Sequence, residues 1–142
     1  MATVAQLLGH KSGALYSVAP DAPVLEAIRL MAEHSVGALL VMEGAQLAGI
    51  VSERDYARKV ILKGRSSHNT PVRQIMTTEV ITVDPANSAE RCMQIMTDRR
   101  VRHLPVIDAG RVVGILSIGD LVRAVLLEQA QTIEQLENYI HH

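Results

Sequence analysis

The stretch GIVSERD at residues 49–55 returns as GILSIGD at residues 114–120. Both copies read glycine, two aliphatic residues, serine, two variable residues and aspartate. Sliding the chain by 65 positions aligns residues 15–60 with residues 80–125 without a gap, and 12 of these 46 pairs are identical. Agreement at this level indicates an internal repeat, so we expect two copies of one structural unit.

Each copy predicts the element order strand–helix–strand–strand–helix, which is an α+β architecture. The short runs YSVAP and VITVDP each predict a brief strand that ends at a proline. Apolar residues at helical spacing follow, and Asn87 with Glu90 matches the pattern of a capping box. A strand, a glycine-containing turn and a second strand come next. The last helix of each copy is expected to begin at the motif serine.

Composition restricts the possible functions. The formal net charge is −1 and aromatic residues make up 2% of the chain, with no Phe or Trp, which argues against nucleic-acid binding. No run of about 18 apolar residues is present, so no membrane segment is expected. The single Cys92 excludes an internal disulfide and fits a reducing compartment, so we expect a cytoplasmic protein.

The motif residues have two interpretations. The spacing of Ser52 to Asp55 and of Ser117 to Asp120 is that of a helix capping box, which needs no ligand. However, a hydroxyl, a carboxylate and free amides at one helix start also suit a phosphorylated sugar. The carboxylate would accept hydrogen bonds from two ribose hydroxyls, and the serine would approach phosphate.

These repeats resemble a tandem pair of cystathionine-β-synthase-type (CBS) domains, known as a Bateman module. The two motifs, the strands SVGALLVME and RVRHLPVID before them, and the VITVDP run carry the resemblance, which covers essentially the whole chain. The resemblance implies two βαββα repeats about a pseudo-twofold axis, with flanking terminal helices. It places the first repeat at 1–66 and the second, with the carboxy-terminal helix, at 67–142, in one compact module.

The resemblance also implies two nucleotide sites, each formed by the motif of one copy and the early strands of the other. In site A, Asp55 would hold ribose, cationic side chains would neutralise phosphate and aliphatic residues would enclose adenine: Ser52, Arg54, Asp55, Val80, Ile81, Arg102, His103 and Pro105. Site B would comprise Tyr16, Gly37, Ala38, Ser117 and Asp120.

Site B lacks the cations of site A, because Gly119 stands where the first copy has Arg54. It is therefore expected to prefer a less charged ligand, to bind weakly, or to borrow Arg54. His103 has an alternative role as an ordinary strand histidine. Cys92 is expected to be a buried hydrophobe, and the scattered histidines predict no metal site.

The expected function is that of a stand-alone regulatory module that senses energy or metabolite state for an unknown protein target. AMP is the ligand expected first, with ATP, ADP, NAD and S-adenosylmethionine as further candidates, and no catalytic cofactor or enzymatic constellation is apparent. A disc-shaped homodimer is implied by the resemblance. The tail from residue 128 predicts an amphipathic helix that packs on its own domain or forms a dimer contact. The alternative function is a ligand-free structural protein in which both motifs are only caps.

Overall fold

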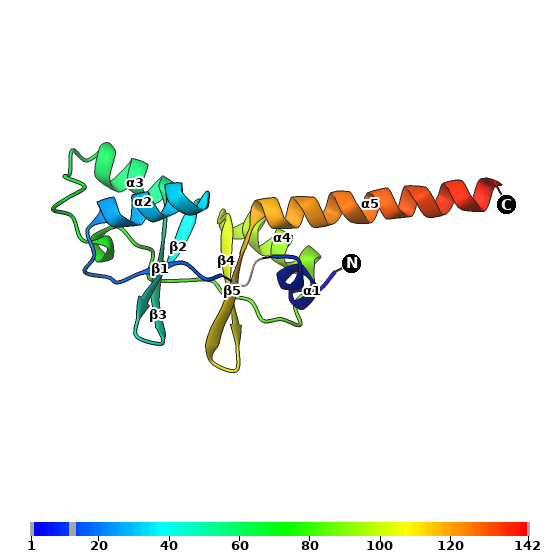
Figure 1. The fold of residues 1–142 in the computed structure, drawn as a ribbon, viewed down its shortest axis with the longest axis horizontal. Helices are drawn as coiled ribbons and strands as arrows, with labels where there is room; N and C mark the ends of the chain where they lie inside the picture. Colours follow the sequence, from blue (N-terminus) through cyan, green and yellow to red (C-terminus); the bar gives the residue numbers. More distant parts are fainter. Residues whose placement is uncertain (1, 12–13, 142) are drawn as a thin grey trace. The chain divides into compact units, whose positions relative to one another are not determined.

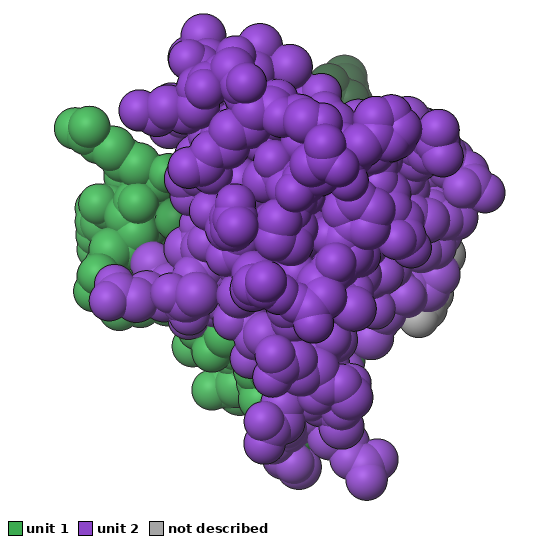
Figure 2. Space-filling model, turned by 90° about the vertical axis from the view of Figure 1, so that its left-hand side faces the viewer, with its two compact units in different colours: residues 1–13, 82–108, 113–142 green, residues 14–81, 109–112 purple. Residues whose placement is uncertain are grey.

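A computed structural model describes residues 2–11 and 14–141. The chain divides into two compact units, shown in different colours in Figure 2. Unit 1 holds most of the second repeat and the amino-terminal segment, and unit 2 holds the first repeat and the linker: residues 1–13, 82–108 and 113–142 for unit 1, residues 14–81 and 109–112 for unit 2.

The sheet of unit 2 has three strands in the order β1-β2-β3 (Figure 1). The two-residue strand β1 (Ser17–Val18) runs parallel to β2 (Ala38–Glu43), which pairs antiparallel with β3 (Gln46–Ser52). Gly44, with φ of 62°, opens the tight turn between β2 and β3, where a left-handed backbone favours glycine. The predicted hairpin is therefore confirmed.

Four helical segments complete unit 2. Helix α2 (Val24–His34) follows β1, and α3 (Glu53–Tyr56) begins directly after β3 and continues as a π-helical turn over Ala57–Ile61. A short 3₁₀ helix covers Val72–Gln74. The helix predicted after the first motif is thus present, although its second half is wound more widely than an α-helix.

Unit 1 repeats this arrangement with a two-stranded sheet. Its elements are α1 (Val4–Gly9), α4 (Ala89–Arg99), β4 (His103–Asp108), β5 (Arg111–Ser117) and α5 (Ile118–His141). Strands β4 and β5 form the hairpin. The 24-residue helix α5 extends beyond the other elements of its unit (Figure 1).

The two cores use equivalent positions. Apolar side chains of the helices and strands are buried in unit 2 at ten positions: Val18, Val24, Ala27, Met31, Leu39, Val41, Val51, Val60, Val72 and Ile75. Seven of these have a buried counterpart 65 residues later in unit 1: Val83, Ala89, Cys92, Met96, Leu104, Val106 and Leu116. The repeat is therefore a repeat of core packing, since burial of such side chains is the main favourable term in folding.

The short helix that precedes each repeat in the sequence belongs to the compact unit of the other repeat. In unit 2, the residues after the 3₁₀ helix cover β3, and Ile50 exchanges two backbone hydrogen bonds with Thr77 at 2.9 and 3.0 Å. In unit 1, the amino-terminal α1 takes this place, and its Leu8 side chain lies against Gly114. The linker helix therefore packs with the first repeat and the amino-terminal helix with the second.

Two local predictions are wrong. Residues 80–85 form no regular strand and contribute only an isolated bridge between Val83 and Val106, because the proline and turn residues beside it leave no room for a longer ladder. Helix α4 is capped by Ser88, whose hydroxyl accepts a hydrogen bond from Arg91 N–H at 3.0 Å, rather than by Asn87. The Asn87 side chain instead accepts from Asp84 N–H at 2.8 Å in the preceding turn.

Candidate functional site

The predicted site residues are divided between the two units. Unit 2 contains eight of them, and the other five belong to unit 1: Tyr16, Gly37, Ala38, Ser52, Arg54, Asp55, Val80 and Ile81, against Arg102, His103, Pro105, Ser117 and Asp120. Each unit brings its own motif together with the start of its own hairpin. The pairing of residues across the two units, on which sites A and B depend, stays a prediction.

The first motif forms a complete capping box at the start of α3. Ser52 Oγ accepts from Asp55 N–H at 3.2 Å, and Ser52 N–H donates back to Asp55 Oδ2 at 3.0 Å. The serine hydroxyl also donates to Asp55 Oδ2 at 3.1 Å. Gly37 C=O accepts from Glu53 N–H at 3.0 Å, which ties the start of β2 to the helix start.

The second motif reproduces this geometry at the start of α5. Ser117 Oγ accepts from Asp120 N–H at 3.2 Å, and Ser117 N–H donates to Asp120 Oδ2 at 2.8 Å. Arg102 C=O accepts from Ile118 N–H at 2.9 Å, as Gly37 does in the first copy. The predicted helix caps are therefore confirmed in both copies, and Arg102 and His103 adjoin the second motif within unit 1.

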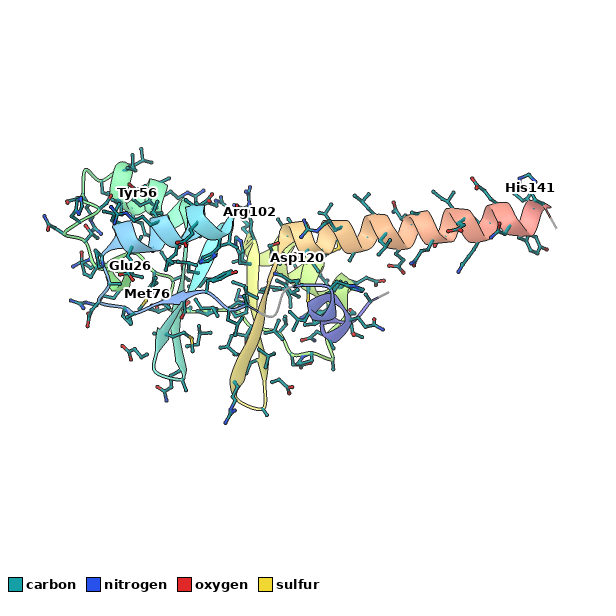
Figure 3. All side chains as sticks on the ribbon, in the orientation of Figure 1. Glu26, Tyr56, Met76, Arg102, Asp120 and His141 are labelled. Carbon is teal, nitrogen blue, oxygen red and sulfur yellow. The ribbon has the colours of Figure 1, made fainter. Side chains whose placement is uncertain are left out.

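The two aspartates differ in their ionic partners. Asp55 Oδ1 lies 3.2 Å from Lys59 Nζ, one helical turn further on, and the Asp55 side chain is 15% exposed. The Asp120 side chain, labelled in Figure 3, is only 7% exposed and forms ion pairs with two cations. Lys11 Nζ donates to its Oδ2 at 2.8 Å, and Arg123 Nη2 donates to its Oδ1 at 2.6 Å. Within residues 2–11 and 14–141, Asp120 is the one acidic residue that is buried.

The second motif therefore has cations beside its aspartate, whereas the composition of site B as a whole stays a prediction. Lys11 and Arg123 supply positive charge from outside the seven-residue motif, in place of the missing Arg54 equivalent. Arg54 itself is exposed on α3. Sequence reasoning missed Lys11 because nothing in the linear order places residue 11 next to residue 120.

Charge and burial act together on the ionisable groups of unit 1. Burial opposes ionisation of Asp120, but the hydrogen bonds from Lys11 and from Ser117 N–H outweigh it and hold the pKa of this carboxyl below its ordinary value. Burial lowers the pKa of His103, and the positive charge of Lys11 lowers it further. His103 is therefore neutral at pH 7 and would meet a phosphate as a hydrogen-bond donor rather than as a cation.

The carbonyl of the second motif residue also has a different donor in each copy. Ile50 C=O accepts from the neutral peptide N–H of Thr77 at 2.9 Å. The equivalent Ile115 C=O accepts from Lys11 Nζ at 2.6 Å. One ammonium group thus bonds both the edge of β5 and the carboxylate of Asp120, as only a multiple donor such as lysine allows.

The remaining predicted residues have varied surroundings. The ring of Tyr16 stacks on His34 with centroids 3.7 Å apart. Val80 and Ile81 are half-buried, and Ala38 and Pro105 are buried. Pro105 C=O accepts from Val83 N–H at 3.1 Å.

Outside the motifs, the described residues offer little further chemistry. Cys92 is fully buried, as predicted, and burial raises the pKa of its thiol, so it is a poor nucleophile at neutral pH. In the described part of the chain, no three His, Cys, Asp or Glu side chains gather as metal ligands would. None of the helices in that part has the length and apolar character needed to cross a membrane.

Comparison with known proteins identifies the family. The family model of the CBS domain matches residues 12–62 and again residues 72–127, one match for each repeat. This chain belongs to the CBS domain family. The predicted CBS pair and its α+β architecture are thus confirmed.

The relatives include proteins of plants and bacteria. The CBS domain-containing protein CBSX3 of Arabidopsis thaliana, described as mitochondrial, is 48% identical over 125 residues, which are 84% of this chain and 61% of that protein. A solved structure from Burkholderia ambifaria MC40-6, described as a signal-transduction protein with CBS domains, is 51% identical with a TM-score of 0.88 and covers 90% of this chain and 96% of its own.

A more distant CBS pair shares the fold. The CBS domain pair of protein MJ0100, solved in complex with 5′-methylthioadenosine and S-adenosyl-L-methionine, has a TM-score of 0.79 at 23% identity and covers 90% of this chain and 98% of its own.

Proposed function

We propose that this CBS pair is a regulatory module that binds adenosine-containing nucleotides and reports their level to a protein target. AMP is the ligand we place first, followed by ADP, ATP and NAD, with S-adenosylmethionine as a further candidate. The module acts by binding and not by catalysis. Sites A and B, as composed above, are the binding sites in this proposal.

The repeated helix start is the observation that carries the proposal. In both units the aspartate carboxylate accepts from the serine N–H and the serine oxygen accepts from the aspartate N–H, so both groups are held together at one helix start. A carboxylate has about four acceptor positions and so suits the paired hydroxyls of a ribose. The adenosine ligands of the MJ0100 pair, which has the same fold, support this ligand class.

The distribution of charge supports phosphorylated ligands over neutral ones. The motif of unit 2 carries the exposed Arg54, and the motif of unit 1 adjoins Arg102 and Lys11. Charge-assisted hydrogen bonds from such groups to phosphate oxygens are worth about 1.5–3 kcal/mol each.

A ligand-free structural role is the second candidate, and one observation favours it. Both motif aspartates already have intramolecular hydrogen-bond partners, so neither carboxylate needs a ligand to be satisfied. In this reading the motifs contribute only the stability of two helix caps, about 0.5–2 kcal/mol each.

Self-association is part of the proposal. From residue 129 to residue 141 every residue of α5 is exposed, and large apolar side chains lie seven positions apart on it, at Leu126, Ile133 and Ile140. A homodimer that covers this face would remove apolar surface from water. The expected cytoplasmic location agrees with the single, unpaired cysteine.

Thermal unfolding in the presence of AMP, ATP, NAD and S-adenosylmethionine tests the proposal. A ligand present at 100 times its dissociation constant stabilises the folded state by about 2.7 kcal/mol. We expect AMP to raise the unfolding midpoint by several degrees. If none of the four compounds moves the midpoint at millimolar concentration, the structural role replaces the sensor.

A further inference from the structure

The carboxylate of Asp120 is held by a residue from a remote part of the chain. Its Oδ2 accepts from both Ser117 N–H and Lys11 Nζ, each at 2.8 Å, and its Oδ1 accepts from Arg123. An oxygen with two donors has both lone pairs in use. A ribose that is to be held by both oxygens of this carboxylate must therefore displace Lys11 from Oδ2.

The first copy has no such contact. There the second donor to Asp55 Oδ2 is the neutral hydroxyl of Ser52, which turns away by a simple rotation. The segment VAQLL at residues 4–8 resembles VRQIM at residues 72–76, which matches Val4 with Val72. Lys11 lies seven residues after Val4, and the residue seven after Val72 is Glu79, which carries the opposite charge. The contact is thus a specific property of the second motif and not a consequence of the shared fold.

Lys11 is placed so that it can change partners. Its side chain is 32% exposed, whereas that of Asp120 is 7% exposed, so the ammonium lies at the border between the buried carboxylate and solvent. Its second bond, to Ile115 C=O at 2.6 Å, keeps it at the motif when the bond to Asp120 breaks.

Building on the proposed function, we propose that Lys11 is a specificity-determining residue of the second motif. Lys11 releases Asp120 only when the incoming ligand is a nucleotide whose phosphate the Lys11 ammonium then binds. A phosphate oxygen replaces the charge-assisted bond that Lys11 loses, so AMP enters without leaving the ammonium unpaired. Adenosine and 5′-methylthioadenosine have no such group. They must displace the lysine without compensation, and the second motif rejects them.

The test isolates the second motif by making every variant in an Asp55→Asn background, which removes the carboxylate of the first motif. Calorimetric titration then measures the affinities for AMP and for adenosine. We expect AMP to bind at least about tenfold more tightly than adenosine, a factor of ten being about 1.4 kcal/mol. Adding Lys11→Met lowers this ratio to near one, because AMP loses its phosphate partner and adenosine no longer competes with the lysine.

Two further variants separate specificity from folding. Lys11→Arg keeps the charge and should keep a preference for AMP, and Lys63→Met, which removes an exposed lysine elsewhere, should leave the ratio unchanged. The inference is overturned if AMP still binds to the Lys11→Met variant with the original ratio, or if Lys11→Arg abolishes the preference as fully as Lys11→Met does. If the wild-type protein binds neither AMP nor adenosine, it is the proposed function that fails, and the inference fails with it.

Discussion

The two seven-residue motifs of this chain have the same backbone geometry and different electrostatics. Ser52 and Ser117 accept the same hydrogen bond from the aspartate three residues on, at 3.2 Å in both copies. Yet Asp55 lies near a single, half-exposed lysine, whereas Asp120 is buried between Lys11 and Arg123. The comparison teaches that the helix cap is the common element, and that residues outside the motif decide how available each carboxylate is to a ligand.

Removing the aspartates should separate the two copies most clearly. We expect Asp120→Ala to lower the free energy of unfolding by about 3 kcal/mol, because it removes a cap and leaves Lys11 without its buried partner. Asp55→Ala should cost about 1 kcal/mol, the value of a cap. Urea unfolding of both variants measures the difference, and equal losses would mean that the ionic partners of Asp120 contribute nothing.

The motif glycines offer a matched pair with a smaller effect. A Cβ at residue 49 would lie 2.7 Å from Thr77 O, a backbone atom, and 2.9 Å from Met76 Sδ, whereas the atoms nearest to one at residue 114 belong to the Leu8 side chain, the first at 2.5 Å. We expect Gly49→Ala to destabilise by about 2 kcal/mol and Gly114→Ala by about half of that, since a leucine side chain moves more easily than a backbone. Unfolding midpoints in urea would show the order, and a larger loss at residue 114 would contradict it.

Acid should remove the effect of Lys11. The folded-state pKa of Asp120 is lowered, so its ionic bonds stabilise the protein above the unfolded-state pKa of about 3.9 and are lost as the pH falls through the lower, folded value. We expect Lys11→Met to cost about 1–2 kcal/mol at pH 7, and this difference from wild type to shrink toward zero near pH 2. Urea titrations at a series of pH values provide the measurement. A difference that does not change with pH would assign the effect of Lys11 to packing rather than to charge.

The smallest effect is expected from His103. Its pKa is lowered by burial and by Lys11 and Arg102, while Asp120 acts in the opposite direction. As the pH falls, His103 is therefore protonated at a higher pH in the unfolded chain than in the folded protein. The free energy of unfolding of the wild type should fall as the pH drops below about 6.5. His103→Gln should flatten this fall by less than about 1 kcal/mol, since pKa shifts of one unit correspond to 1.36 kcal/mol. An unchanged pH profile between pH 7 and pH 5 would show that His103 titrates as it does in the unfolded chain.

The sequence predicted the repeat, the two hairpins and both capped helix starts, because each rests on residues close together in the chain. Apolar spacing fixes which faces are buried, and the serine–aspartate pair fixes where a helix begins. The strand expected over 80–85 was wrong because the proline and turn residues beside Val83 limit its pairing to one bridge with Val106, and the extent of such pairing with a remote partner cannot be read from the local pattern.

The partners of the motifs could not be predicted for the same reason. Thr77 and Lys11 satisfy equivalent carbonyls, at Ile50 and Ile115, with different chemical groups. The weak match between the segments VAQLL and VRQIM shows that the two surroundings are related. It does not show which segment packs on which repeat, since that is decided by tertiary packing.

Calorimetric titration of AMP into the wild-type protein, Asp55→Asn and Asp120→Asn tests the central claim most directly. Asparagine keeps a side-chain oxygen for the cap but removes the charge that would hold two ribose hydroxyls. The account predicts that wild type binds AMP, that Asp55→Asn loses the tighter binding event, and that Asp120→Asn retains it. Unchanged AMP binding in both variants would contradict the account, because the motif aspartates would then be helix caps and nothing more.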